Sequence, residues 1–171
     1  MGQFTELKDR LVIINGVAKG YAMTGWRIGY IAAPKAIVSA CNKIQGQYTS
    51  GICTIAQAAS LEAVKMSPEN SEEIQTMLKA FRNRRDMFFE LLSEIPGLKL
   101  SKPAGAFYMF PEVKSYFGKT DGETTINNSD DLCLYLLNKA HVACVAGAAF
   151  GNEECIRLSY ATSEDKLREA A

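Results

Sequence analysis

Lys19 is the residue whose type and surroundings point most directly to chemistry. It follows the aliphatic run Leu11–Ile14, which is typical of a buried strand, and it is followed by Gly20. An exposed lysine amine is protonated and a poor nucleophile, whereas burial and a neighbouring cation both favour the neutral amine. We therefore interpret Lys19 as a candidate for imine formation with a carbonyl cofactor. The alternative is a solvated loop lysine.

Two arginines in apolar runs are candidates for holding anions. Arg27 lies between Gly25 and Gly29, eight residues after Lys19, and Arg157 lies in the segment IRLSYA. A guanidinium is rarely buried unless it meets an anion, and its planar fork matches a phosphate or a carboxylate. The alternatives are an arginine at a strand end that pairs with an acid, for Arg27, and a surface arginine on an alternating strand, for Arg157.

The composition narrows the class of protein. The 171 residues are 47% hydrophobic, and Lys+Arg and Asp+Glu both number 19. This balance disfavours a nucleic-acid-binding protein, and no apolar run is long enough to span a bilayer. The first residues lack the apolar centre of a secretory signal, so we expect a cytoplasmic protein.

Metal binding is not expected from the cysteines and the single histidine. The five cysteines have no CxxC pair, and His141 has no second histidine to form a ligand set. We expect reduced thiols and a structural role for His141, at the junction of a helix and a strand.

Apolar periodicity predicts the elements that must position Lys19 and Arg27. We expect a buried strand at 11–15, a second strand at 26–33, a helix that starts at Pro34, a loop at 46–51 and a helix at 54–66. A long helix is predicted over 71–95, with Arg82, Arg84 and Arg85 pointing outward.

After Gly97 the sequence pattern changes from long helices to short strands and turns. Strands are predicted at 98–101, 106–110, 142–145 and 156–160, with an exposed excursion at 114–128. Ser129 is expected to cap a helix over 130–139, and Ser163 to cap a final helix. We expect a first part over 1–75, a connecting helix over 76–96 and a compact α+β unit over 97–171.

Several segments together resemble one enzyme family. NGVAKGYAMTGWRIGY is similar to the lysine segment of class I pyridoxal-phosphate (PLP) aminotransferases, most closely in the bacterial aspartate aminotransferase branch. IAQAASLEAV, PAGAFYMFPEV and VAGAAFG with IRLSYATSEDKLREA match further segments in the same order. The resemblance implies an α/β fold of type I, with 1–75 the C-terminal part of the large PLP-binding domain and 97–171 the small domain.

The resemblance also implies a role for each of the three cations. Lys19 matches the lysine that forms the internal aldimine and moves the substrate proton, and Arg27 matches the arginine that holds the cofactor phosphate. Arg157 matches the arginine that binds the substrate α-carboxylate. Ala146 departs from the pattern, because relatives commonly carry proline there. This change is expected to loosen the loop without changing the chemistry.

The resemblance covers only the C-terminal portion of such an enzyme. The family's acidic partner for the pyridine nitrogen, its cofactor-binding tyrosine and asparagine, and its glycine-rich phosphate loop are expected upstream of this chain. We therefore expect an aminotransferase parent that acts on aspartate and a 2-oxo acid as a homodimer, and an inactive isolated chain with exposed apolar surface. Two alternatives remain open, a PLP-dependent lyase or synthase on the same fold and a non-catalytic association module.

Overall fold

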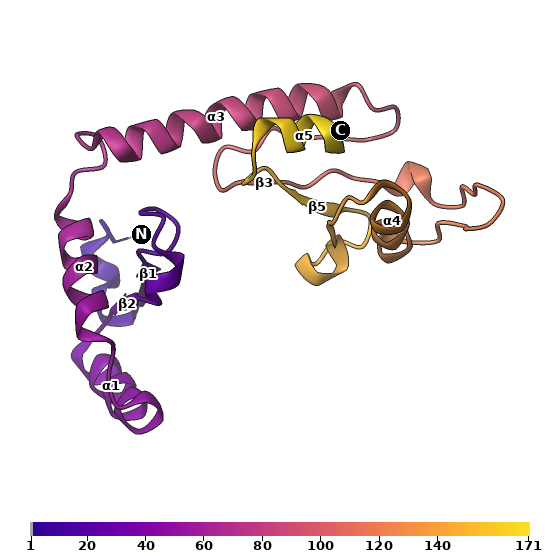
Figure 1. The fold of residues 1–171 in the computed structure, drawn as a ribbon. Helices are drawn as coiled ribbons and strands as arrows, with labels where there is room; N and C mark the ends of the chain where they lie inside the picture. Colours follow the sequence, from indigo (N-terminus) through magenta and orange to yellow (C-terminus); the bar gives the residue numbers. More distant parts are fainter. Residues whose placement is uncertain (1) are drawn as a thin grey trace. The chain divides into compact units, whose positions relative to one another are not determined.

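The chain is divided into two compact units. The computed structural model describes residues 2–171, and the units are Met1–Thr76 and Met77–Ala171 (Figure 1). The elements of each unit are described within that unit. The helix α3 (Glu72–Ser93) contains the boundary between them.

The first unit is built around a hairpin of two antiparallel strands. β1 (Ile13–Gly16) pairs with β2 (Gly29–Ala32) in the register Ile13↔Ala32 and Gly16↔Gly29. Both strands are shorter than the ranges 11–15 and 26–33 predicted from the sequence. The 3₁₀ turn η2 (Thr24–Trp26) precedes β2, and Arg27 is left-handed at φ 57°, a conformation that a strand does not contain. A further 3₁₀ segment, η1 (Thr5–Arg10), precedes the hairpin.

Two helices complete the first unit. α1 (Lys35–Thr49) follows Pro34, and α2 (Thr54–Lys65) matches the helix predicted over 54–66. The loop predicted at 46–51 is wrong in its first half, because α1 continues through Gly46 to Thr49. A single glycine costs a helix only about 1 kcal/mol, and the Thr49 hydroxyl bonds the Gln45 carbonyl in the last turn. The helix ends only at Ser50, where φ becomes 61°.

The first unit exposes much of its apolar surface. The strand over 11–15 was expected to be buried, yet Ile14 is 78% exposed. On the helices, Tyr48 is 84% exposed and Ile55 is 74% exposed. This exposure agrees with the apolar surface expected for the isolated chain.

The long helix α3 carries arginines in three different environments. Arg82 is exposed, as predicted, but Arg84 and Arg85 are partly buried. The Arg84 guanidinium lies 5.8 Å from the centre of the Phe81 ring, and Arg85 Nε bonds Asp86 at 2.8 Å. The prediction that all three arginines point outward is therefore wrong, because Arg84 packs against an aromatic ring and Arg85 binds a carboxylate.

The second unit contains a three-stranded antiparallel sheet in the order β3-β5-β4. β3 (Tyr108–Met109) and β4 (Val145–Ala146) flank β5 (Ile156–Ser159), with Tyr108↔Ser159 and Val145↔Arg157 opposite each other. The strand predicted over 98–101 is reduced to one bridge, Lys99↔Glu112. The strand predicted over 142–145 begins only at Val145, because the left-handed His141 ends the preceding helical segment and residues 142–144 have no regular structure.

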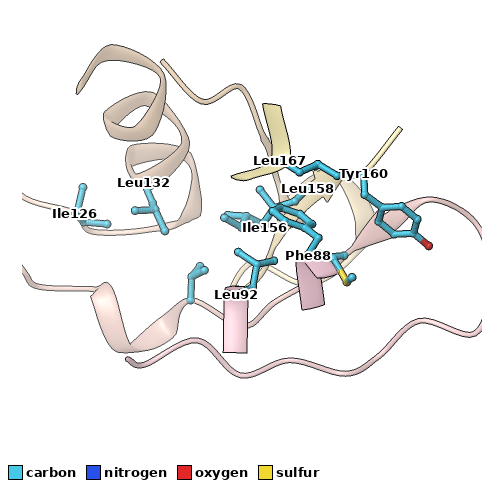
Figure 2. Close-up of a cluster of buried hydrophobic side chains, with 10 residues drawn as sticks. Phe88, Leu92, Ile126, Leu132, Ile156, Leu158, Tyr160 and Leu167 are labelled. Carbon is cyan, nitrogen blue, oxygen red and sulfur yellow. The ribbon is translucent and has the colours of Figure 1, made fainter. Parts of the chain in front are cut away.

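Helices and a long connection close the core of this unit (Figure 2). α5 (Glu164–Ala170) lies beside α3 in Figure 1, and its Leu167 packs in one cluster with Phe88. The Ser163 cap is confirmed, because its hydroxyl accepts a bond from Lys166 N. The excursion over 114–128 contains the 3₁₀ turn η3 (Lys114–Tyr116) and is not wholly exposed, because Ile126 is buried in the core.

One helix of this unit begins and ends differently from the prediction. α4 (Ser129–Tyr135) continues as the π-helical segment η4 (Leu136–Ala140). Its cap is Asn128, whose side-chain oxygen accepts a bond from Asp131 N at 2.9 Å, rather than Ser129. Asparagine and serine are equally good caps, so the sequence alone did not separate these neighbours.

Candidate functional site

Lys19 lies in the tight turn that follows β1. Val17 is fully buried and anchors this turn, and its carbonyl accepts a bond from Tyr21 N at 3.3 Å. The Lys19 carbonyl accepts a similar bond from Ala22 N at 3.3 Å. The turn is thus fixed at its start, and Lys19 is presented at an exposed position.

Arg27 is held in a strained conformation immediately before β2. Its φ of 57° and ψ of 47° place a side chain with a Cβ in the left-handed region, which costs about 1–2 kcal/mol. Its Nη1 donates to the Thr24 carbonyl at 2.9 Å. Such strain persists where the surroundings enforce it, and it is concentrated at functional sites. Within residues 2–171, Arg27 forms no ion pair, which removes the acid-paired alternative for the described part of the chain.

Arg27 lines an open cavity of about 640 Å³ within the first unit. This volume falls in the range of small-molecule sites. The lining contains no acidic residue among those described, so the guanidinium is its only charge. The lining residues are Gly25, Trp26, Arg27, Gln45, Thr49, Gly51, Ile52, Cys53, Ile55 and Ala56. Lys19 belongs to the same unit but does not line this cavity.

Arg157 lies between two aromatic rings in the second unit. Its guanidinium carbon is 4.4 Å from the centre of the Tyr108 ring and 4.2 Å from that of Phe150. Ring faces attract a cation without using its hydrogen-bond donors. Because Arg157 forms no ion pair with any described acid, its fork remains able to bind a carboxylate in a bidentate manner.

Local structure fixes both rings of this clamp. Tyr108 is on β3 and contacts the neighbouring Phe107 ring at 4.6 Å. Phe150 ends the 3₁₀ turn η5 (Gly147–Phe150), and its ring packs edge-to-face with that of Phe110, with ring centres 6.2 Å apart. Gly147 is required at the start of this turn, because a Cβ there would collide with the carbonyls of Asn152 and Cys155.

Sequence reasoning did not identify the two clamp residues Tyr108 and Phe150. The aromatic residues of GAFYMF and AAFG were visible, but only the fold brings both of them to Arg157. The three predicted residues are divided between the units. Lys19 and Arg27 lie in the first unit, and Arg157 lies in the second.

The remaining candidate groups are simpler. The five cysteines are all free, and His141 caps the π-helical segment in a left-handed conformation. Among residues 2–171, no group of three or more histidine, cysteine or acidic side chains could bind a metal ion. No helix in this part of the chain combines the length and the apolarity needed to cross a membrane.

Comparison with known proteins gives consistent matches over nearly the whole chain. The family described as "Aminotransferase class I and II" matches residues 3–171. A bifunctional aspartate aminotransferase and glutamate/aspartate-prephenate aminotransferase of Petunia hybrida is 51% identical, over 95% of this chain and 34% of its own length. An aspartate/prephenate aminotransferase of Cereibacter sphaeroides is 44% identical, over 96% of this chain and 40% of its own.

Solved structures give the same result. The aspartate aminotransferase of Rhizobium meliloti matches with a TM-score of 0.89 and 43% identity, over 96% of this chain and 40% of its own. An aromatic aminotransferase of Pyrococcus horikoshii matches with a TM-score of 0.83 and 36% identity, over 95% of this chain and 41% of its own. The chain thus spans only about two fifths of the length of most of these relatives.

Proposed function

The chain belongs to the class I and II aminotransferases, a PLP-dependent family of fold type I, and from this premise we propose the function of the protein that contains it. That function is the transfer of an amino group between an amino acid, aspartate in the first instance, and a 2-oxo acid. The family match over residues 3–171 carries the proposal. The choice of aspartate is supported by the names of the relatives.

The first unit would contribute cofactor binding in this proposal. The cofactor supplies an electron sink for the bond changes at the substrate α-carbon. The residues present fit two of its groups, because Lys19 offers an exposed amine for the aldehyde and Arg27 offers a guanidinium beside a cavity for the phosphate. When neutral, Lys19 Nζ would take the proton from the substrate α-carbon.

The second unit would contribute substrate recognition. Arg157 would bind the α-carboxylate with two parallel hydrogen bonds, while Tyr108 and Phe150 keep the guanidinium in place. A substrate held in this way presents its α-carbon in one orientation, which lowers the entropic part of the barrier. The two rings support this role because they hold the guanidinium in place and leave its positive charge and its hydrogen-bond donors available for a carboxylate.

We propose three parts of the parent enzyme within this chain, and the division of the structure between Thr76 and Met77 supports the first of their boundaries. We assign 1–75 to the C-terminal part of the large cofactor-binding domain, 76–96 to a connecting helix and 97–171 to the small domain. We also propose that the parent enzyme is a homodimer. The exposed side chains of Tyr48 and Ile55 in the first unit support this, because apolar side chains that are this exposed often lie in protein–protein interfaces. The cytoplasmic location expected from the sequence stays a prediction.

Reductive labelling tests the cofactor-binding part of the proposal on this chain. The chain is incubated with increasing PLP, reduced with borohydride and digested, and the labelled lysines are identified by mass spectrometry. Lys19 is expected to be labelled at a lower PLP concentration than Lys35, another exposed lysine of the first unit, at the start of α1. Pyridoxal without its phosphate is expected to lose this preference, because Arg27 then has no anion to bind.

Two variants separate specific labelling from general reactivity. Arg27→Gln should abolish the preference for Lys19, whereas Lys35→Arg should leave it intact. Equal labelling of Lys19 and Lys35 in the wild type would contradict the assignment of Lys19. An unchanged preference in Arg27→Gln would contradict the assignment of Arg27.

A further inference from the structure

Cys133 and Cys144 form a close pair of thiols that the transamination site does not use. Their sulfur atoms lie 3.4 Å apart, and both residues are partly buried against the core of the second unit. Cys133 lies on α4, and Cys144 immediately precedes β4. Both side chains pack against the same core cluster, which keeps the two sulfurs close together.

We propose that Cys133 and Cys144 are a redox-active dithiol that closes to an intramolecular disulfide. A disulfide bond is about 2.05 Å long, so the sulfurs must approach by about 1.4 Å. Side-chain rotation about the Cα–Cβ bonds provides movements of this size.

The reaction is a thiol exchange with a small-molecule disulfide such as oxidised glutathione. One protein thiolate attacks a glutathione sulfur, and the first glutathione leaves as a thiol. The second protein thiol, as its thiolate, then attacks the protein sulfur of this mixed disulfide and displaces the second glutathione. The protein loses two protons and two electrons in total, and one glutathione disulfide takes them up to become two glutathione thiols.

The surroundings of the pair determine which step is slow. Burial, followed by the contact with Cys144, raises the pKa of Cys133 to about 12. Burial also raises the pKa of Cys144, although the Cys133 thiol partly offsets this by hydrogen bonding to its thiolate. Cys144 is therefore the better first nucleophile. The first attack is slow at neutral pH and faster at higher pH, whereas the second step is favoured by the proximity of the sulfurs.

The cross-link would have a local structural effect beside Arg157. Cys144 is adjacent to Val145, which lies opposite Arg157 in the β4–β5 ladder. A disulfide would tie this strand to α4 and would restrict the unfolded chain by closing a short loop. We expect the oxidised form to unfold at a higher urea concentration than the reduced form. We also expect the amide resonances of Val145 and Arg157 to shift on oxidation.

The test is oxidation of the 171-residue chain with glutathione disulfide at pH 8, followed by digestion and mass spectrometry without reduction. A cross-linked peptide that joins Cys133 and Cys144 is expected in about tenfold excess over any other cysteine pairing. The exposed Cys41 and Cys53 are expected to retain glutathione instead. Reduction with dithiothreitol should restore both thiols.

Serine variants provide the controls. Cys41→Ser with Cys53→Ser should leave the cross-link unchanged, because neither residue takes part. Cys144→Ser should greatly slow modification of Cys133, and Cys133→Ser should trap Cys144 as a glutathione adduct. Circular dichroism of the reduced variants checks that they fold. Glutathione adducts on both Cys133 and Cys144 of the Cys41→Ser, Cys53→Ser protein, without the cross-link, would overturn the proposal even if the single variants do not fold.

Discussion

The aromatic clamp around Arg157 makes a prediction about energetic coupling. Cation–π contacts contribute about 0.5–1 kcal/mol at exposed sites and about 2 kcal/mol when they are desolvated. Arg157 is partly buried and Phe150 is 46% exposed, at a separation of 4.2 Å, so the lower half of this range applies. We expect a coupling free energy of about 1 kcal/mol between Arg157 and Phe150.

A double-mutant cycle isolates this coupling from the other effects of each substitution. Arg157→Gln, Phe150→Leu and the double variant are unfolded in urea, and the unfolding is followed by far-UV circular dichroism. Trp26, the single tryptophan, belongs to the first unit and would not report on the clamp. Loss of the Phe150 contact with Phe110 occurs in both arms of the cycle and cancels.

A matched cycle shows whether the coupling is specific. Phe150→Leu combined with Lys119→Gln removes a cation that lies 4.8 Å over a different ring, that of Tyr116. This pair shares no partner with the clamp, so its coupling should be zero within about 0.3–0.5 kcal/mol. If the Arg157–Phe150 coupling were equally small, the rings would not hold the guanidinium, and the reasoning about a fixed carboxylate site would fail.

Three further predictions follow from individual residues. Ala146→Pro should stabilise the chain by about 0.4–1 kcal/mol in urea unfolding, because Ala146 already has the φ of −60° that proline requires. The neighbouring ladder hydrogen bond is donated by Gly147 N and not by Ala146 N. A loss of stability would show that the Ala146 N–H or the space for the proline ring is needed. Hydrogen bonds from Arg85 and Lys102 lower the pKa of Asp86 from its usual 3.8 to about 2. The stability that ionised Asp86 contributes is therefore present above about pH 4 and is lost as the pH falls from 4 to 2. The difference in Tm between the wild type and Asp86→Asn should therefore shrink over that interval, and a constant difference would be contrary to the ion-pair interpretation. With PLP, aspartate and 2-oxoglutarate, the 171-residue chain should form glutamate no faster than PLP does without protein. The reason is that the chain spans about two fifths of the length of its relatives and that Lys19 is exposed. A normal transaminase rate would refute this prediction.

The helices were predictable because their signals are local. The apolar period of the segment over 71–95 predicted α3, and the alanine-rich segment over 54–66 predicted α2 within one residue at its C-terminal end. The left-handed conformations of Arg27 and Ser50 were not predictable, because arginine and serine carry no local signal for positive φ. These residues set the start of β2 and the end of α1.

Burial and the clamp depend on residues far apart in the sequence. An aliphatic run such as 11–15 shows that a strand can be buried, but not whether a cover is present, and Ile14 is 78% exposed. Tyr108 and Phe150 reach Arg157 only through the pairing of β3 and β4 with β5. The lysine segment was readable because its residues are contiguous, whereas the clamp required tertiary structure.

The surroundings of Arg157 and those of Lys19 should differ in local stability, and hydrogen exchange can measure this difference. In β5, Arg157 lies between the buried Ile156 and Leu158, and Ile156 N donates to the Pro111 carbonyl at 3.1 Å. The strand β1, next to Lys19, has one partner strand and is mostly exposed. Amides of β5 should therefore exchange at least about 100-fold more slowly than those of β1. Equal rates would show that Arg157, proposed to bind the carboxylate, has no more rigid support than Lys19, proposed to bind the cofactor. A slower β5 would mean that the arginine proposed to bind the substrate carboxylate has rigid support within this chain, whereas the segment around Lys19 has little.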